Sequence, residues 1–163
     1  ASTNQLDLFM GKRFGLEYTD QDGEKKVPAV IHRAPLGTHE RFIGFLIEHY
    51  GGAFPTWLSP VQAVILPISD KQLGYAQKVQ IALREQNIRV ELDDKQEPIG
   101  GKIRRATLQK VPYICIIGEK EKQQASVDGV DVVSLRLRNG TDQGVISVAE
   151  LAKKIQTDIE KKL

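Results

Sequence analysis

Two side chains suited to ligand binding, His32 and Arg41, lie on either side of a glycine turn. Arg41 falls in the first turn of an expected helix, where the helix dipole disfavours a cation unless an anion lies opposite. The backbone N–H groups of Gly37 and Thr38, just before that helix, point toward the same anion. This arrangement predicts a phosphate site. The alternative is a solvated first helical turn.

His32 stands alone at the end of an expected buried strand. A histidine in such a place is more often a hydrogen-bonded core or cleft residue than a metal ligand. The other candidate ligands are His39 and His49 on the following helix and Cys115 in a later strand, and their spacing does not assemble a closed tetrahedral zinc site. From the residues alone, the structural interpretation of His32 is therefore favoured.

A third group of candidates is basic and lies in the second half of the chain. Its members occupy the expected helix at residues 99–110, which Gly100 and Gly101 leave open at its start, and a neighbouring strand. They are Lys102, Arg104, Arg105, Lys110, Arg136 and Arg138. A solvated helix face is the usual explanation, but their concentration in a nearly neutral chain favours contact with RNA phosphates or bases. Few aromatic residues accompany them, which argues against bulk binding of single strands.

The composition is that of a globular protein. The chain has 163 residues, 40% hydrophobic and 27% charged, enough for one large or two small domains. Its net charge of +2 permits a polyanionic partner without requiring one. The single cysteine, Cys115, fits a reduced compartment, and no apolar run is long enough to span a membrane. We expect a soluble, cytoplasmic protein, and the chain to be the C-terminal piece of a longer one.

The elements that position these residues follow from the apolar pattern. In the first part we expect a strand at Gln5–Phe9 and, beside it, an antiparallel hairpin over Phe14–Arg33 that turns at Asp22-Gly23. A helix ending at Gly51-Gly52 follows. The second strand of that hairpin, Val27–Arg33, is expected to be buried. Such a small piece buries too little surface to be stable alone, so its sheet expects further strands from other sequence.

After a linker at residues 51–60, strands alternate with helices. Such alternation predicts a three-layer α/β domain with a mostly parallel sheet. Ser147 and Glu150 form a capping box that begins the last helix. The expected strands are Gln62–Ile68, Ile88–Leu92, Val111–Ile117, Asp131–Leu137 and Gly144–Ser147, and the expected helices are Gln72–Gln86, Ile99–Lys110 and the segment from Ser147 to the end.

The stretch HRAPLGTHERFIGFLIEHYGGAFPTWLSPVQ closely resembles the third class II motif and following linker of threonyl-tRNA synthetases. STNQLDLF and IRVELDDKQEPIGGKIRRATLQKVPYICIIGEKE resemble other segments of that family in the right order. The resemblance implies that residues 1–58 are the end of an antiparallel-sheet class II catalytic domain. Residues 59–163 would then be an anticodon-binding domain, a three-layer α/β/α fold with a mixed sheet.

The implied activity is that of a threonine–tRNA ligase, which activates threonine with ATP and Mg²⁺ and transfers it to threonine tRNA. By resemblance, Arg41 contacts ATP phosphate, and Gly37 and Thr38 form the nucleotide-contacting turn. Thr3 and Gln5 match the strand that lines the threonine and adenylate pocket. Arg41 carries the catalytic role. The chain alone is expected to be inactive, because the other catalytic motifs lie elsewhere, and the complete enzyme is expected to be a homodimer.

The resemblance also reverses the interpretation of His32, which matches one protein ligand of the family's catalytic Zn²⁺. The remaining ligands would come from earlier sequence, outside this chain. In the second domain, Arg104, Glu121 and Arg136 match positions that bind anticodon bases, and Gln96 stands where an asparagine is common. Two alternatives remain: an anticodon-type RNA-binding or accessory module without aminoacylation activity, and a synthetase-like protein used only for protein interaction.

Overall fold

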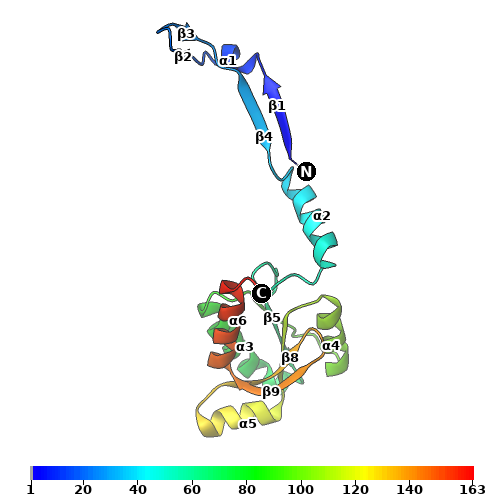
Figure 1. Cartoon of the computed structure of the whole chain (residues 1–163). Coiled ribbons are helices and arrows are strands. Elements are labelled where there is room, and N and C mark those ends of the chain that lie inside the picture. Colours follow the sequence, from blue (N-terminus) through cyan, green and yellow to red (C-terminus); the bar gives the residue numbers. More distant parts are fainter. Residues whose placement is uncertain (1) are drawn as a thin grey trace. The chain divides into compact units, whose positions relative to one another are not determined.

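The protein is described by a computed structural model that covers residues 2–163 and divides into two compact units (Figure 1). The first unit is Ala1–His49 and the second is Tyr50–Leu163. None of the described helices is long and apolar enough to cross a membrane.

The first unit contains two small antiparallel sheets and two helices. β1 pairs with β4 over five residues, and β2 pairs with β3 around the predicted turn at Asp22-Gly23. Gly23 has a positive φ of 79°, which a side chain would strain. The elements are β1 (Thr3–Asp7), α1 (Met10–Arg13), β2 (Tyr18–Thr19), β3 (Lys25–Lys26), β4 (Val30–Ala34) and α2 (His39–Tyr50).

The predicted hairpin over Phe14–Arg33 is correct only at its tip. Its strands are short, and the chain beyond Pro28 leaves the hairpin and pairs with β1 instead. Proline has no backbone N–H to donate to a strand ladder, so pairing is interrupted there. The end of the predicted first strand also differs, because Leu8 and Phe9 lead into α1.

The apolar side chains of the first unit are largely exposed, which contradicts the predicted burial of its last strand. Ile31 on β4 is 68% exposed, and α2 has no buried residue although it carries Phe42, Ile43 and Phe45. The pattern correctly indicated a strand and a helix, but the unit contains too few elements to cover them.

The second unit is a five-stranded mixed sheet with strand order β6-β5-β7-β8-β9. β6, β5 and β7 are parallel, whereas β8 and β9 are antiparallel to their neighbours. This confirms the predicted mixed α/β architecture. The elements are β5 (Ala63–Pro67), η1 (Asp70–Gln72), α3 (Leu73–Glu85), β6 (Val90–Leu92), α4 (Ile99–Leu108), β7 (Tyr113–Ile117), α5 (Glu119–Asp128), β8 (Val132–Leu137), β9 (Asp142–Ser147) and α6 (Val148–Glu160).

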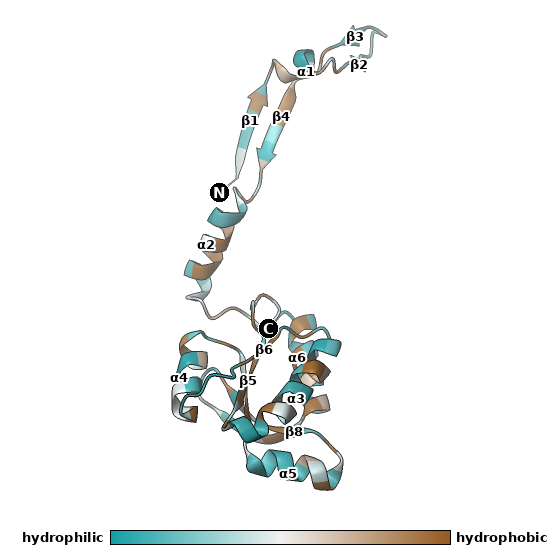
Figure 2. Cartoon of the chain, turned by 180° about the vertical axis from the view of Figure 1, so that it is seen from behind, coloured by the Kyte–Doolittle hydropathy of each residue, from teal (hydrophilic) through white to brown (hydrophobic). Residues whose placement is uncertain are grey.

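The two faces of this sheet carry two apolar clusters. Alternate residues of β5 point to opposite faces, so Ala63 and Ile65 pack with α3 and α6, while Val64 and Leu66 pack with Ala106 of α4. In Figure 2 the strands of this unit are mainly brown, and the helices carry most of the teal. The side of the sheet on which α4 packs is called the α4 face below.

Helix α5 was not predicted. Its sequence, EKEKQQASVD, has almost no apolar periodicity, and Glu121 is its only buried residue. The helix begins at Gly118, whose backbone N–H donates to Glu121 Oε2 at 2.8 Å, and ends at Gly129 with a positive φ of 69°. Its boundaries are therefore set by hydrogen bonding and by a glycine rather than by an apolar stripe.

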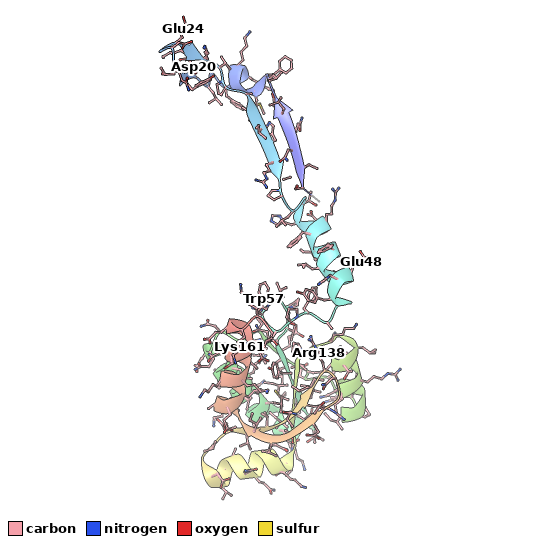
Figure 3. All side chains as sticks on the ribbon, viewed as in Figure 1. Asp20, Glu24, Glu48, Trp57, Arg138 and Lys161 are labelled. Atoms are coloured by element: carbon pink, nitrogen blue, oxygen red, sulfur yellow. The ribbon has the colours of Figure 1, made fainter. Side chains whose placement is uncertain are left out.

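Residues 50–58, which end at the predicted domain boundary, belong to the second compact unit and pack on it. The guanidinium of Arg138 donates to the carbonyl of Phe54, and Arg89 Nη2 donates to the carbonyl of Trp57 at 2.9 Å. Figure 3 labels Trp57 and Arg138. A linker whose carbonyls are bound in this way belongs structurally to the domain that binds them.

The predicted capping box of α6 is present. Ser147 Oγ accepts a hydrogen bond from the backbone N–H of Glu150 at 3.2 Å and donates to its carboxylate at 2.8 Å. We expect Ser147→Ala to lower the free energy of unfolding of the second unit by about 1 kcal/mol, measured by urea denaturation. Ser126→Ala is the matched control, because Ser126 is exposed inside α5 and caps nothing. Equal stability of the two variants would contradict the capping role.

Candidate functional site

One face of the β1/β4 ribbon gathers three of the predicted site residues. Gln5 pairs directly with His32, and Thr3 lies two residues before Gln5 on the same face. Asp7 lies two residues after Gln5 and joins them. This face therefore combines a hydroxyl, an amide, an imidazole and a carboxylate, which together can bind a small polar molecule.

Asp7 is the residue of this face that sequence reasoning missed. Its Oδ2 lies 3.3 Å from His32 Nε2, and its Oδ1 accepts the backbone N–H groups of Phe9 and Met10, each at 2.8 Å. The N–H groups of Met10 and Phe9, and then His32, lower the pKa of the Asp7 carboxyl. The carboxylate is thus available to orient the imidazole. Only the strand register, which the sequence does not give, brings them together.

The turn before α2 has the geometry of a small anion site. Gly37 has a φ of 74°, which a side chain would strain, and Thr38 Oγ1 accepts the backbone N–H of Arg41 at 3.3 Å. Arg41 packs close to this turn, since a Cβ atom added to Gly37 would lie 3.4 Å from Arg41 Cδ. Within residues 2–163 the guanidinium of Arg41 makes no hydrogen bond or ion pair, so an exposed cation lies beside the helix start.

No complete metal site exists among the residues that the structure describes. They contain no group of three or more histidine, cysteine, aspartate or glutamate side chains that could hold an ion. His32 by itself can supply one ligand. Its contact with Asp7 is of the kind that fixes the ring of a metal-bound histidine, because such rings usually donate their other nitrogen to a carboxylate.

In the second unit, the four predicted anticodon-binding residues are associated with the α4 face or the loop leading to it. Gln96 lies in the loop between β6 and α4, and Arg104 lies on α4 itself. Arg136 pairs with Ile114, a member of the cluster under α4, so its side chain shares that face. Glu121 bonds Ser134, which precedes Arg136 by two positions on β8.

The two arginines of this set keep donors that can reach a ligand. Arg104 is exposed, and within the described chain its guanidinium has no hydrogen-bond or ion-pair partner. Arg136 is half-buried and donates from Nε to the carbonyl of Gly140 at 3.2 Å. Within residues 2–163 the other nitrogens of its guanidinium have no hydrogen-bond or ion-pair partner and remain able to donate. Guanidinium groups of this kind suit the acceptor edges of bases or phosphates.

Glu121 is held more tightly than sequence reasoning suggested. It is 9% exposed, and its two carboxylate oxygens accept from the N–H of Gly118 and from Ser134 Oγ at 2.8 and 3.1 Å. A carboxylate has about four lone-pair sites, so a further donor is still possible. In the structure, Glu121 takes part in the cap at the start of α5 and connects that helix to β8.

The expected open basic face is wrong for most of its members. Lys102 is 3% exposed and lies in the protein interior, and the half-buried Arg105 pairs with Asp93 and Glu97. Lys110 binds the carbonyl of Gly51, and Arg138 that of Phe54. Gly100 and Gly101 do not precede the helix but lie in its first turn. Four of the six basic side chains are therefore engaged by groups of the protein itself, and Arg104 and Arg136 keep donors that can reach a ligand.

Gln96 borders a shallow pocket formed where β5 and β6 end. Its amide Nε2 donates to Asp70 Oδ2 at 3.1 Å, and Ser69, Lys95 and Pro98 also line the pocket. Sequence reasoning missed Asp70, which lies in η1 far from Gln96 along the chain. Ligands of α/β folds commonly bind at this carboxyl edge of parallel strands.

Cys115 is a structural residue. It is fully buried in the sheet, and burial raises the pKa of its thiol to about 12. A thiol that stays protonated is a poor nucleophile and a poor metal ligand.

Comparison with known proteins agrees with this geometry. The family model described as "Anticodon binding domain" matches residues 62–158. The chain is 48% identical over 157 residues to a threonine–tRNA ligase of Halorhodospira halophila, covering 96% of this chain and 24% of that protein. It is 50% identical over 160 residues to one of Clostridium botulinum, covering 98% and 24%. The chain thus spans about a quarter of the length of these curated relatives.

Solved structures give the same picture. The RNA-binding domain of threonyl-tRNA synthetase from Cryptosporidium parvum aligns with a TM-score of 0.74 and 34% identity, over 96% of this chain and 38% of that one. A prolyl-tRNA synthetase from the same organism aligns with a TM-score of 0.71 over 99% of this chain and 33% of that one. At 23% identity, the second likeness concerns the fold alone.

Proposed function

The chain belongs to the anticodon-binding domain family, and on that premise we propose that it is the part of a threonine–tRNA ligase that binds the anticodon and completes the ATP site. The observation that carries the proposal is the 48–50% identity to threonine–tRNA ligases, which extends over both units. Family membership of the second unit alone would be compatible with other anticodon-binding proteins.

The proposed reaction has two steps. The threonine carboxylate attacks the α-phosphate of ATP, giving threonyl-adenylate and pyrophosphate. A hydroxyl of the terminal tRNA ribose then attacks the carbonyl of the adenylate and releases AMP. Mg²⁺ accompanies ATP as a substrate complex. The complete enzyme is expected to work as a cytoplasmic homodimer.

In the first step, Arg41 is proposed to bind ATP phosphate and to stabilise the charge that develops on it. The absence of an internal partner for its guanidinium within residues 2–163 supports this role, as does its position beside the helix start. Gly37 and Thr38 would approach the nucleotide through the turn. Thr3 and Gln5 would line the pocket for threonine and the adenylate.

His32 is proposed to be one ligand of a Zn²⁺ ion whose other ligands come from outside this sequence. Its contact with Asp7 fits that assignment, because the carboxylate occupies Nε2 and leaves Nδ1 for the metal. When bound, zinc supplies a Lewis acid that holds amino and hydroxyl groups of the amino acid. Discrimination against valine, which has no hydroxyl, would follow.

In the second unit, Arg104, Arg136, Gln96 and Glu121 are proposed to bind anticodon bases. Bases exposed in a tRNA loop present their pairing edges, which guanidinium, amide and carboxylate groups match. The accessible side chains of Arg104 and Arg136 on the α4 face support base contact most directly.

We expect Arg104→Ala to weaken binding of the chain to a threonine anticodon stem-loop by about tenfold, because one charged, bidentate contact is lost. Fluorescence anisotropy with labelled stem-loop measures it. Lys153→Ala is the matched control, since it removes the same charge from an exposed site on α6, which packs on the other face of the sheet. If both variants bind as the unmodified chain does, Arg104 does not contact the anticodon.

A further inference from the structure

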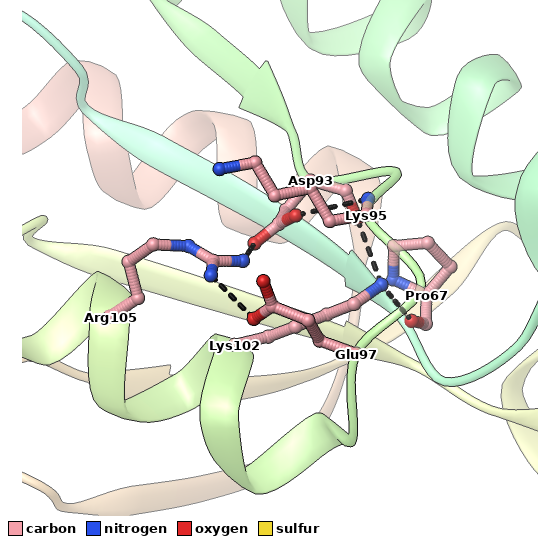
Figure 4. A network of polar contacts seen from close by, with 6 residues as sticks. All are labelled: Pro67, Asp93, Lys95, Glu97, Lys102 and Arg105. Atoms are coloured by element: carbon pink, nitrogen blue, oxygen red, sulfur yellow. Dashed lines mark hydrogen bonds and ion pairs between the residues drawn. The ribbon is translucent and has the colours of Figure 1, made fainter.

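Lys102 is a charged residue in an interior position. Its side chain is 3% exposed, and its ammonium donates to the carbonyls of Pro67 and Asp93, each at 3.0 Å (Figure 4). Both acceptors are neutral backbone groups. Moving an ammonium out of water is costly unless it is fully compensated, and an apolar side chain of similar length would fill the same space without that cost.

The two carbonyls belong to different strands. Pro67 is the last residue of β5, and Asp93 directly follows the last residue of the adjacent parallel strand β6. Lys102 itself lies in the first turn of α4, so its ammonium connects two strand ends to the helix that follows them. The connection fixes the point from which the β6–α4 loop departs.

Arg105 lies one turn further along α4 and binds two side chains of the same loop. It donates to the carboxylate of Asp93 and, at 2.5 Å, to that of Glu97 (Figure 4). Burial is the largest single influence on the Asp93 carboxyl and acts to raise its pKa. The hydrogen bonds from Arg105 and from the backbone N–H of Lys95, together with the charges of Arg105 and Lys102, outweigh burial and lower the pKa. The loop is therefore held at Asp93 through both its backbone carbonyl and its carboxylate, and at Glu97 through its carboxylate.

Gln96 lies just before the second of these attachment points. Its amide is oriented from the other side by Asp70, which accepts from Nε2 at 3.1 Å. That bond leaves the carbonyl Oε1 and one N–H of Gln96 for a ligand. Base recognition by an amide requires this orientation to be maintained, since the same side chain rotated by half a turn exchanges donor and acceptor.

We propose that Lys102 and Arg105 are positioning residues, which hold the Asp93–Glu97 loop so that Gln96 presents a fixed hydrogen-bonding edge to an anticodon base. The proposal rests on the proposed function and goes beyond it, because neither residue touches the RNA. They act on specificity rather than on the attraction to phosphate.

The test compares the unmodified chain with Lys102→Met and Arg105→Met. For each, Kd is measured for a threonine anticodon stem-loop and for stem-loops with one anticodon base changed, at several salt concentrations. We expect the discrimination between stem-loops to fall by about tenfold in both variants. The salt dependence should be unchanged for Lys102→Met, because a buried lysine releases no counterion from the RNA. The side-chain amide NMR signals of Gln96 should broaden or shift in both variants.

Ile155→Val is the control for a general loss of stability. Ile155 is fully buried on α6, away from the loop, so this variant should be destabilised yet keep its discrimination. If Lys102→Met does not fold, Arg105→Met decides, since Arg105 is half-buried and its loss does not leave a core cavity. Retained discrimination in a folded variant would overturn the proposal. A lack of discrimination in the unmodified chain would instead overturn the proposed function.

Discussion

Replacing Arg41 with alanine in a complete threonine–tRNA ligase that contains this sequence is expected to lower the rate of threonine-dependent ATP–pyrophosphate exchange by about 10²- to 10³-fold. A preorganised donor aimed at developing charge contributes that much to catalysis. Arg41 lies in the first turn of α2, where the macrodipole opposes a cation, and its guanidinium makes no interaction within the described part of the chain. The expected loss is in kcat more than in folding.

Arg33→Ala is the matched control for that experiment. Arg33 is an exposed arginine in the same unit, but it neighbours His32 on β4 and therefore points to the opposite face of the ribbon. Its removal should leave exchange unchanged. If Arg41→Ala retained the full exchange rate while Arg33→Ala lost it, the phosphate site would have to lie on the face of the β1/β4 ribbon that carries Arg33.

The second large effect concerns folding. We expect the isolated fragment 1–49 to be unfolded in water and the isolated fragment 50–163 to fold. The first unit leaves Phe9 83%, Ile31 68% and Phe45 59% exposed, and α2 buries no residue. A short two-stranded ribbon is marginally stable at best. The second unit buries two apolar clusters on either side of a five-stranded sheet.

Dispersion of amide signals in heteronuclear NMR spectra of the two fragments measures this difference. Limited proteolysis of the whole chain is an independent check, and the first cleavages should fall before Tyr50. Protection of the first unit, with cleavage beginning in the second, would show that the exposed apolar residues pack in a way that the structure lacks.

The architecture of the second unit was largely predictable because most of its elements have strong local sequence patterns. The apolar run of β5, the periodic apolar residues of α3, and the cap of α6 each correspond to a strong local pattern. Helix α5 was not predictable in the same way, since it has no apolar stripe and depends on the bond from Gly118 to Glu121.

The first unit shows where local patterns fail. Its strand and helix propensities were correctly identified, but burial depends on partners, and those are not among its own elements. The break at Pro28 was visible in the sequence, and the physical rule about proline should have shortened the predicted hairpin.

Candidate site residues could be proposed from the sequence one at a time, but their contacts could not. The position of Arg41 in a helix start indicated a phosphate site from the local sequence. The pairing of His32 with Asp7, and of Gln96 with Asp70, depends on strand register and loop placement, which no local pattern contains. Lys102 illustrates a different error, because a lysine on a basic helix was expected to face RNA and is buried instead.

The central claim, that this chain recognises the anticodon of threonine tRNA, is tested most directly by competition binding of the whole chain. A labelled threonine anticodon stem-loop is displaced by unlabelled stem-loops that differ from it in a single anticodon base. We expect the matched competitor to bind at least about tenfold more tightly than each altered one, with affinity that falls as salt rises. Equal affinity for the matched and altered stem-loops would contradict the account.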